Sequence, residues 1–309
     1  MKSEIAAPSK SRWGLAVGLM LLSALMFSAM QLMIRFSSAG GSFPLMEQVF
    51  FRNLIGLPAV CGILLKKRIF PLGSASAQPY LFGRSLAGFL GIVTFFYATN
   101  HARIADANIL NKLSPIFVTL LSALLLRERI PKIQCAALAL SFFGAWLVCG
   151  PGLRSAPTAM LAALLSALFS GIAYTFVSAL RGKADSLVVI THFSVFSVLC
   201  ALPGMAAHFT MPTAEQFFQL MLISVFGSLG QIALTYSYHL APAPAISVYN
   251  YSGIVWSALL GWLFLGEALP GNTLLGGLLI IAASLLTFIH TQRNQTQESV
   301  SYTNPREVL

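Results

Sequence analysis

The sequence predicts an all-α membrane protein with ten transmembrane helices, and three observations support this fold class. Of its 309 residues, 57% are hydrophobic and only 9% are charged, whereas a soluble domain carries about 25% charged residues. Ten apolar stretches follow one another, each long enough to cross the hydrocarbon core as a helix. Glycine, proline or charged residues separate these stretches. A cytosolic enzyme, a secreted disulfide scaffold and a disordered chain are therefore excluded.

The apolar stretches are justified as helices by their length. They are too long for barrel strands of about 10 residues, and an open sheet edge would leave backbone groups unsatisfied in lipid. The first stretch is also too long for the core of a signal peptide and lacks a cleavage site, so we expect it to be retained. The ten expected spans are residues 13–36, 44–65, 79–99, 103–126, 131–149, 157–180, 186–207, 213–239, 241–264 and 271–290.

Lysine and arginine are distributed unevenly between the two sets of loops. If residues 1–12 are a cytoplasmic segment, thirteen of the 19 basic residues fall in cytoplasmic segments and only Arg103 and Arg154 in outer loops. The positive-inside rule therefore places both termini in the cytoplasm. Residues 291–309 are polar, and we expect a disordered cytoplasmic tail. The net charge of +10 then indicates cytoplasmic loops and not nucleic-acid binding.

No motif in the chain indicates an enzyme, a metal site or a cofactor. There is no HExxH or GxSxG pattern and no Walker A motif, so the energy for any transport must come from a gradient or from the substrate. The four cysteines are scattered through apolar stretches without a CxxC pair, and we expect them to be small buried hydrophobes. They are Cys61, Cys135, Cys149 and Cys200.

The two halves of the chain share a pattern. A shift of 139 residues superposes TLLSALLLRER (119–129) on ALLGWLFLGEA (258–268), and it pairs Asn111 with Asn250. We therefore expect two five-helix repeats, residues 13–149 and 157–290. Because five is odd, the second repeat must cross the membrane in the opposite sense. Inverted repeats are typical of secondary transporters, whose substrate site lies near the midplane. The alternative is a chance match between leucine-rich helices.

At these residues the chain resembles the EamA family of the drug/metabolite transporter superfamily. LSPIFVTLLSALLLRER recurs as SGIVWSALLGWLFLGEALPGNTLLGG, and Arg52 and Pro115 match the family's recurring positions. The resemblance implies a ten-helix inner-membrane carrier of small metabolites. The first copy is similar to members that handle zwitterions resembling S-adenosylmethionine or opine metallophores. The second copy departs from the pattern, because Ile254 stands opposite Pro115 and no arginine matches Arg52.

The second span carries ionisable groups that lipid would not tolerate. Such groups cost about 2.5–3.5 kcal/mol at the centre of the bilayer and so should face a cavity or a partner. Gln48 and Arg52 are four residues apart and share a helix face, and the guanidinium of Arg52 fits a carboxylate or phosphate bidentately. We expect Arg52 and Gln48 to bind substrate. A structural ion pair of Arg52 with Glu47 or Asp106 is the alternative.

The fourth span is polar where Pro115 should bend it. Freed backbone carbonyls near the bend would be available to a ligand, as in the interrupted helices of transporters. We expect this span to line the cavity, although Lys112 could instead extend to the interface or pair with Asp106. The expected substrate contacts here are Asn108, Asn111 and Lys112.

The second repeat offers aromatic groups instead. Tyr249 and Trp256 are two helical turns apart and can stack on the organic part of a substrate, with Asn250 beside them. An interfacial aromatic belt is the alternative. His192 is expected either to pack through a hydrogen bond or to carry protons. The candidates for proton coupling are Glu47, Asp106 and His192.

Other residues have expected architectural roles. Glu128 and Glu267 sit where each hairpin turns, and a carboxylate at a helix N-terminus is stabilising. Pro115 bends its helix. Glycines of the third and tenth spans allow close helix approach, and Gly276 and Gly277 alternatively form a dimer contact.

The sequence therefore favours a secondary transporter that moves a small amphoteric or anionic metabolite by alternating access, with export preferred. Import of a nucleoside-like or S-adenosylmethionine-like metabolite is the alternative. An intramembrane enzyme lacks its motifs. A channel would require a symmetric polar ring, whereas the two copies differ in their polar residues.

Overall fold

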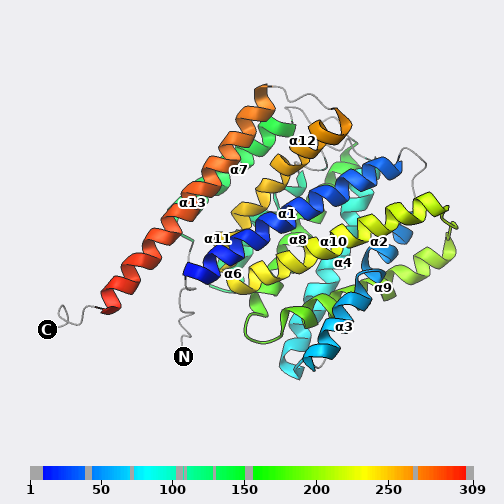
Figure 1. Ribbon diagram of the computed structural model, residues 1–309, viewed down its shortest axis with the longest axis horizontal. Coiled ribbons are helices and arrows are strands. Elements are labelled where there is room, and N and C mark those ends of the chain that lie inside the picture. The colour runs from blue at the N-terminus through cyan, green and yellow to red at the C-terminus, as the bar shows by residue number, and fades with distance from the viewer. Residues whose placement is uncertain are drawn as a thin grey trace.

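The computed structural model describes residues 10–38, 44–69, 73–101, 107, 110–127, 130–149, 156–266 and 271–303. Over these residues the chain is helical and forms no strand (Figure 1). In chain order the elements are α1 (Lys10–Ser38), α2 (Leu45–Leu54), α3 (Leu57–Lys67), the 3₁₀ turn η1 (Ala75–Ala77), α4 (Gln78–His101), α6 (Ser114–Leu125), α7 (Lys132–Cys149), α8 (Pro157–Ala179), α9 (Ser186–Ala207), α10 (Ala214–Leu240), α11 (Ala243–Ser247), η2 (Val248–Tyr251), α12 (Ser252–Leu265) and α13 (Gly271–Thr303).

Within the described residues, six helical stretches are long and apolar enough to cross a membrane. They are residues Arg12–Ile34, Ala75–His101, Pro157–Ala179, Ser186–Ala207, Ala214–Leu240 and Ala243–Leu265. Three shorter apolar helical stretches lie in α6, α7 and α13. The all-helical prediction is confirmed, and the apolar helices agree with a membrane protein.

The second expected span, residues 44–65, is two helices and not one. Residues 55 and 56 form a turn between α2 and α3, and Gly56 caps the N-terminus of α3. A Cβ at Gly56 would collide with the side chain of Ser228 on α10, so the close approach of α10 requires glycine here. Pro58 lies in the first turn of α3, where its missing N–H costs no hydrogen bond.

The fourth and ninth spans are also interrupted. Pro115 was expected to bend a continuous helix, but it lies in the first turn of α6, directly after a turn at residues 112–113. Proline suits a first turn and not a helix interior, so the helix restarts here. The expected span 241–264 is divided into α11, η2 and α12. Pro242 and Pro244 lie at the start of α11, where proline is tolerated, and the 3₁₀ turn η2 separates α11 from α12.

The last helix is longer than its expected membrane span. α13 continues to Thr303, whereas the sequence predicted a disordered tail from residue 291. No glycine or proline occurs between residue 278 and residue 304, so nothing in this stretch breaks the helix.

Side chains fix the beginnings of two helices of the second half. The Asp185 carboxylate accepts a hydrogen bond from the Leu187 N–H at 2.8 Å and so caps α9. Thr213 and Gln216 form a capping box at the start of α10. Both arrangements satisfy backbone N–H groups that a helix leaves unpaired.

The helices pack in pairs that join the two halves of the chain. α1 packs along α10 and α12, while α8 packs along α4 and α6. α2 lies against α9 and α10, and α9 also lies against α4. α7 pairs with α13 at one edge of the bundle, as Figure 1 shows. The first turn of α1 and the far end of α13 lie toward the same end of the bundle (Figure 1).

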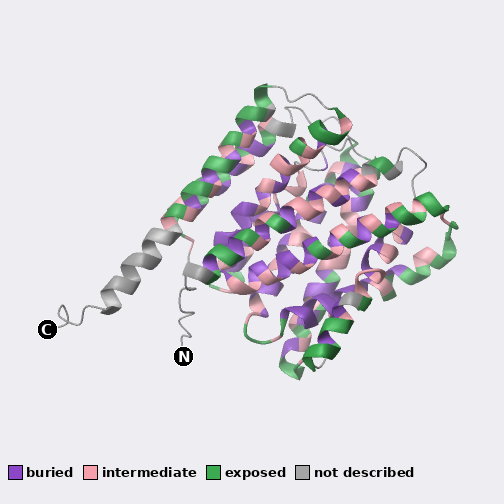
Figure 2. Cartoon of the chain, in the orientation of Figure 1, coloured by how far each residue is buried: buried purple, intermediate pink, exposed green. Residues whose placement is uncertain are grey.

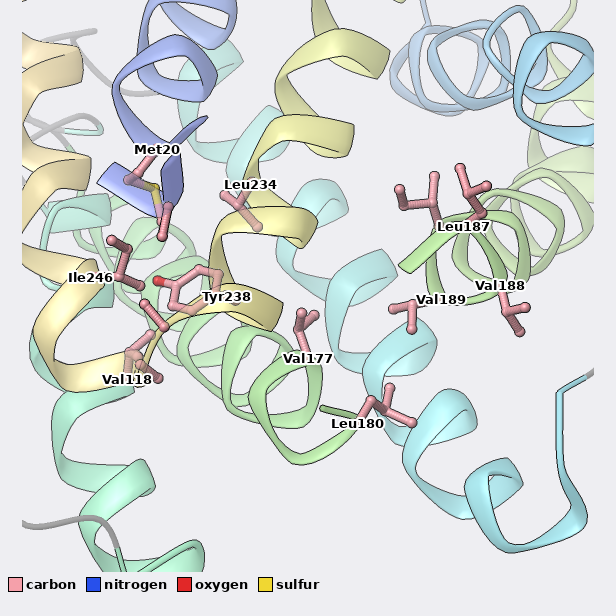
Figure 3. Packing of buried hydrophobic residues seen from close by; sticks show 14 of the residues in the cluster. Met20, Val118, Val177, Leu180, Leu187, Val188, Val189, Leu234, Tyr238 and Ile246 are labelled. Carbon is pink, nitrogen blue, oxygen red and sulfur yellow. The ribbon is translucent and has the colours of Figure 1, made fainter. Parts of the chain in front are cut away.

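A large apolar core lies at the end of the bundle where α1 begins. Its members come mainly from the start of α1, the ends of α8 and α10, the start of α9, and α11. In Figure 3, Met20, Leu234, Tyr238 and Ile246 converge from three of these helices. Figure 2 shows exposed residues on the outer faces of the bundle. Many exposed residues are large and apolar, such as Leu124 and Leu263. Such an outer face is suited to lipid.

Arg181, which follows α8, forms hydrogen bonds with the end of α10. Its Nη2 donates to the Ser178 hydroxyl at 3.1 Å, to the Tyr238 carbonyl at 3.0 Å and to the Ala241 carbonyl. The last carbonyls of a helix have no helical partner, and a cation there is favourable.

Replacing Arg181 with alanine should therefore lower the free energy of unfolding by about 1.5 kcal/mol, since charge-assisted hydrogen bonds are lost. Thermal unfolding of the purified protein in detergent measures the change. Arg181→Lys should recover only part of it, because lysine lacks the guanidinium fork. An unchanged melting temperature for Arg181→Ala would show that these bonds do not stabilise the fold.

Candidate functional site

A small pocket lies among α2, α3, α9 and α10. Its volume is about 10 Å³, which is roughly the space that one water molecule needs. This pocket is therefore too small for a metabolite as it stands, and a larger opening here requires its walls to move. The lining residues are Arg52, Asn53, Gly56, Val60, Ile190, Phe193, Ser194, Gly227, Ser228, Gln231 and Ile232.

Arg52 is the charged residue in the pocket wall, on the second expected span as the sequence predicted. Only 7% of its surface is exposed. Its Nε and Nη1 form no hydrogen bond within the described residues. The guanidinium carbon lies 6.0 Å from the centre of the Phe27 ring. A Cβ at Gly227 would come within 3.2 Å of Arg52 Nε, so this glycine on α10 leaves room for the side chain.

Arg52 is not neutralised by Glu47. Both residues lie on α2 and no ion pair joins them, so the alternative of a structural pair between Arg52 and Glu47 is not observed. Glu47 is completely buried, and its Oε2 accepts a hydrogen bond from the Thr210 N–H at 3.3 Å, while Oε1 has no partner among the described residues. Asp106, the other proposed partner of Arg52, lies outside the described residues.

Arg84 on α4 is a second buried arginine. It is 1% exposed, and its Nε and Nη1 form no hydrogen bond within the described residues. Its guanidinium carbon lies 4.0 Å from the centre of the Phe193 ring, and Phe193 lines the pocket. Tyr174 and Arg52 are its electrostatic neighbours. Two positive charges thus lie near each other in the interior of the protein.

The sequence analysis gave Arg84 no role. The signal that could have found it is its position within residues 79–99, with Gly88 one turn later. A Cβ at Gly88 would meet Arg84 Nη1 and would lie 2.8 Å from Phe193 Cε2. The glycine therefore leaves the space that the guanidinium occupies.

His192 lies next to this arginine cluster. Its Nδ1 shares a hydrogen bond of 2.8 Å with the Ser85 hydroxyl, and Arg84 is an electrostatic neighbour. The bond fits the packing role that the sequence reasoning considered, while proton coupling stays a prediction.

A separate polar contact joins the fourth and ninth spans. Lys112 Nζ donates to the Asn250 carbonyl at 3.3 Å, and Asn111 Nδ2 donates to the Ser166 hydroxyl at 2.6 Å. Lys112 and Asn250 were both predicted to bind substrate, and the structure brings them together. Neither lines the pocket of Arg52. Asn108 lies outside the described residues.

The predicted aromatic wall is divided. Tyr249 is buried in η2 and packs edge-on against Trp13, with ring centres 6.4 Å apart. Trp256 lies on α12. The two residues therefore do not belong to one continuous α-helix, and the prediction that they share a helix face does not apply. The Tyr249 hydroxyl and Trp256 Nε1 have no hydrogen-bond partner among the described residues.

The remaining predicted residues are placed as follows. Gln48 lies on α2, one turn before Arg52, and is not in the pocket wall. Glu128 and Glu267 lie outside the described residues. Gly276 packs against Gly144 of α7, and Gly277 faces Val255 of α12, so both glycines serve contacts within the chain. In the described part of the chain, no group of three His, Cys, Asp or Glu residues could hold a metal ion.

Comparisons with known proteins agree with this architecture. A model of the "EamA-like transporter family" matches residues 14–150 and again residues 157–289. The pseudopaline exporter CntI of Pseudomonas aeruginosa (strain UCBPP-PA14) is 34% identical over 269 residues, which cover 86% of this chain and 93% of the relative. An S-adenosylmethionine uptake transporter of Rickettsia bellii (strain RML369-C) is 22% identical over 293 residues, covering 93% and 98%.

The fold also matches a solved crystal structure with a TM-score of 0.78, over 90% of this chain and 98% of that chain. The two sequences are 19% identical, so this likeness concerns the fold alone. The apolar helices and the transporter relatives together make the chain an integral, multi-pass membrane protein. The named relatives are transporters and not enzymes, as the sequence predicted.

Proposed function

Because the chain belongs to the EamA-like transporter family, we propose that it is a secondary carrier that exports a small amphoteric or anionic metabolite by alternating access. The observation that carries this proposal is the buried guanidinium of Arg52, whose Nε and Nη1 have no hydrogen-bond partner in the described chain, in a pocket between helices of both halves. An isolated buried charge is costly, so a protein that retains one needs it for a ligand of opposite charge.

The packing of the helices supports an inverted repeat of ten spans. If α1 to α7 form one unit and α8 to α13 the other, the contact of α1 with α10 has its counterpart in that of α8 with α4. The contact of α1 with α12 corresponds to that of α8 with α6, and that of α2 with α10 to that of α9 with α4. A two-fold axis between the units would produce these exchanged pairs.

Two pairs of glycines support the same relation. The shift of 139 residues pairs Gly88 with Gly227 and Gly91 with Gly230. Gly88 leaves room for Arg84 and Gly227 for Arg52. Equivalent positions of α4 and α10 therefore make space for one buried arginine each, although the arginines themselves are not equivalent in sequence.

The interruptions of the fourth and ninth spans also correspond. The turn at residues 112–113 and the 3₁₀ turn η2 (Val248–Tyr251) lie close to one shift apart. Discontinuous helices near the midplane line the substrate sites of many transporters. Lys112, Asn111 and Asn250 lie at these interruptions, and we assign them to the substrate pathway with Tyr249 and Trp256.

The conformation fits one state of an alternating-access cycle. The large apolar core closes the end of the bundle where α1 begins, and the positive-inside rule makes this the cytoplasmic end. The pocket is too small for a metabolite. We therefore assign the structure to a state closed toward the cytoplasm of the inner membrane, with both termini on that side. Glu47, Asp106 and His192 are the proposed groups for proton coupling.

Metabolite profiling tests the carrier and its direction together. Cells with and without the protein are compared, and both the cell extract and the medium are analysed. We expect an amphoteric or anionic metabolite to accumulate in cells that lack the protein and to decrease in their medium. The reverse pattern would establish uptake, as the name of the Rickettsia relative suggests, and would contradict export. No change in either compartment would contradict the carrier.

A further inference from the structure

Two buried arginines lie near each other in this protein, and neither forms an ion pair with an acidic residue of the described ranges. Arg52 and Arg84 are each less than one-tenth exposed, and each repels the other. In both, Nε and Nη1 are buried without a hydrogen-bond partner in the described chain. Aromatic rings compensate in part, since Phe193 stacks on Arg84 at 4.0 Å and a cation above a ring is attracted to it.

Unpaired buried charges of the same sign destabilise a fold unless a ligand neutralises them. Because this protein retains two such arginines, we expect the substrate itself to carry two negative charges that neutralise them. We propose that Arg52 and Arg84 together bind a substrate that carries two carboxylates, one at each guanidinium. This inference rests on the proposed carrier function and names the class of substrate for the same site.

The location of the two arginines favours two separate carboxylates. Arg52 lines the pocket from α2, where Gly227 leaves room for it, whereas Arg84 of α4 lies behind Phe193 in the space left by Gly88. The Phe193 ring forms part of the pocket wall and lies on Arg84. Binding at both guanidinium groups therefore requires this ring to shift, so that Arg84 faces the pocket. Two carboxylates balance the two guanidinium charges, whereas two phosphates would carry about three to four negative charges.

The polar groups around the arginines suit the rest of such a substrate. Asn53, Ser194, Ser228 and Gln231 line the same pocket and can hydrogen-bond to an amine or hydroxyl between the carboxylates. Glu47 accepts from the Thr210 N–H and forms no ion pair with Arg52. The pocket wall therefore contributes positive charge and neutral polar groups.

Ligand-induced thermal stabilisation tests the proposal on the purified full-length protein. The probes are succinate, glutarate, adipate and pimelate, each compared with the monocarboxylate of the same length, and inorganic phosphate, all at 10 mM and constant ionic strength. At least one dicarboxylate should raise the melting temperature by about 2 °C more than its monocarboxylate, because ligands that bind only the folded state stabilise it. Equal shifts, or a larger shift with phosphate, would overturn the proposal.

Variants locate the effect. Arg84→Met and Arg52→Met each remove a buried charge while keeping a long, unbranched side chain. Each variant should therefore abolish the increase in melting temperature that dicarboxylates produce. Without ligand their melting temperatures should equal or exceed that of the unaltered protein. Lys183→Gln removes a charge that lies over Tyr80 outside the pocket and should leave the shift intact. A lower ligand-free melting temperature for Arg84→Met, or a shift that survives it, would mean that Arg84 is structural.

This binding assay does not depend on transport. If dicarboxylates stabilise the protein but no metabolite changes its distribution in the profiling experiment, the carrier proposal is wrong and the proposed dicarboxylate site is supported. If profiling finds an exported metabolite with one carboxylate or none, the proposal of a dicarboxylate substrate is wrong and the carrier proposal is supported.

Discussion

Replacing Arg52 with alanine should lower the transport of the metabolite identified by profiling by at least about 30-fold. Truncating one partner of a buried charge pair costs about 2 kcal/mol or more, which corresponds to this factor. The loss should be large because Arg52 is buried in the pocket wall and its Nε and Nη1 have no other hydrogen-bond partner in the described chain. Initial rates in cells with equal amounts of membrane-inserted protein measure it.

The matched controls separate charge from geometry. Arg52→Lys keeps the charge but loses the planar fork, so its activity should lie between those of Arg52→Ala and the unaltered protein. Lys183→Gln should transport normally. Unchanged transport by Arg52→Ala would show that Arg52 is not part of the substrate site. Unchanged transport by Lys112→Ala would show that the contact between the fourth and ninth spans is not part of it either.

Replacing Gly144 with valine should destabilise the protein by about 3 kcal/mol, the upper part of the range for overpacked sites. A Cβ at Gly144 would lie 2.6 Å from the Gly276 carbonyl oxygen and 3.0 Å from Ile280 Cγ1. The first of these is a backbone atom, so α7 and α13 would have to move apart. The melting temperature in detergent measures the loss.

Gly18→Ala is the control for the Gly144 variant. Gly18 is exposed on α1, and a Cβ there meets nothing within 4 Å. Alanine favours a helix over glycine by about 1 kcal/mol, so this variant should be neutral or slightly stabilised. If Gly144→Val were as stable as Gly18→Ala, the close contact of α7 and α13 would not contribute to the fold.

Much of the architecture could be predicted because lipid constrains sequence strongly. Length and hydropathy were enough for an all-helical protein, and an arginine within an apolar stretch was enough to mark Arg52. The interruptions could not be located in this way. The turn at Gly56 depends on the approach of Ser228 from α10, which is a contact between distant parts of the chain. The hydropathy of a sequence does not predict such long-range contacts.

The candidate site was predicted less completely, for two physical reasons. Arg84 and Arg52 lie on different spans, and only the packing of α2 and α4 against α9 brings them near Phe193. Arg52 and Lys112 were both predicted to bind substrate, but they do not line the same pocket. Lys112 instead contacts the Asn250 carbonyl, and the pocket is lined by α2, α3, α9 and α10.

The opposite orientation of the two repeats is the central claim, and cysteine accessibility tests it most directly. Lys132 and Gly271 are the first residues of α7 and α13, both are exposed, and they are one repeat shift apart. Lys132→Cys and Gly271→Cys are made separately in a protein whose native cysteines have been replaced. Intact cells are then treated with a membrane-impermeant maleimide. The account predicts labelling of Gly271→Cys in intact cells and of Lys132→Cys only after permeabilisation. Labelling of both positions from the same side would contradict it.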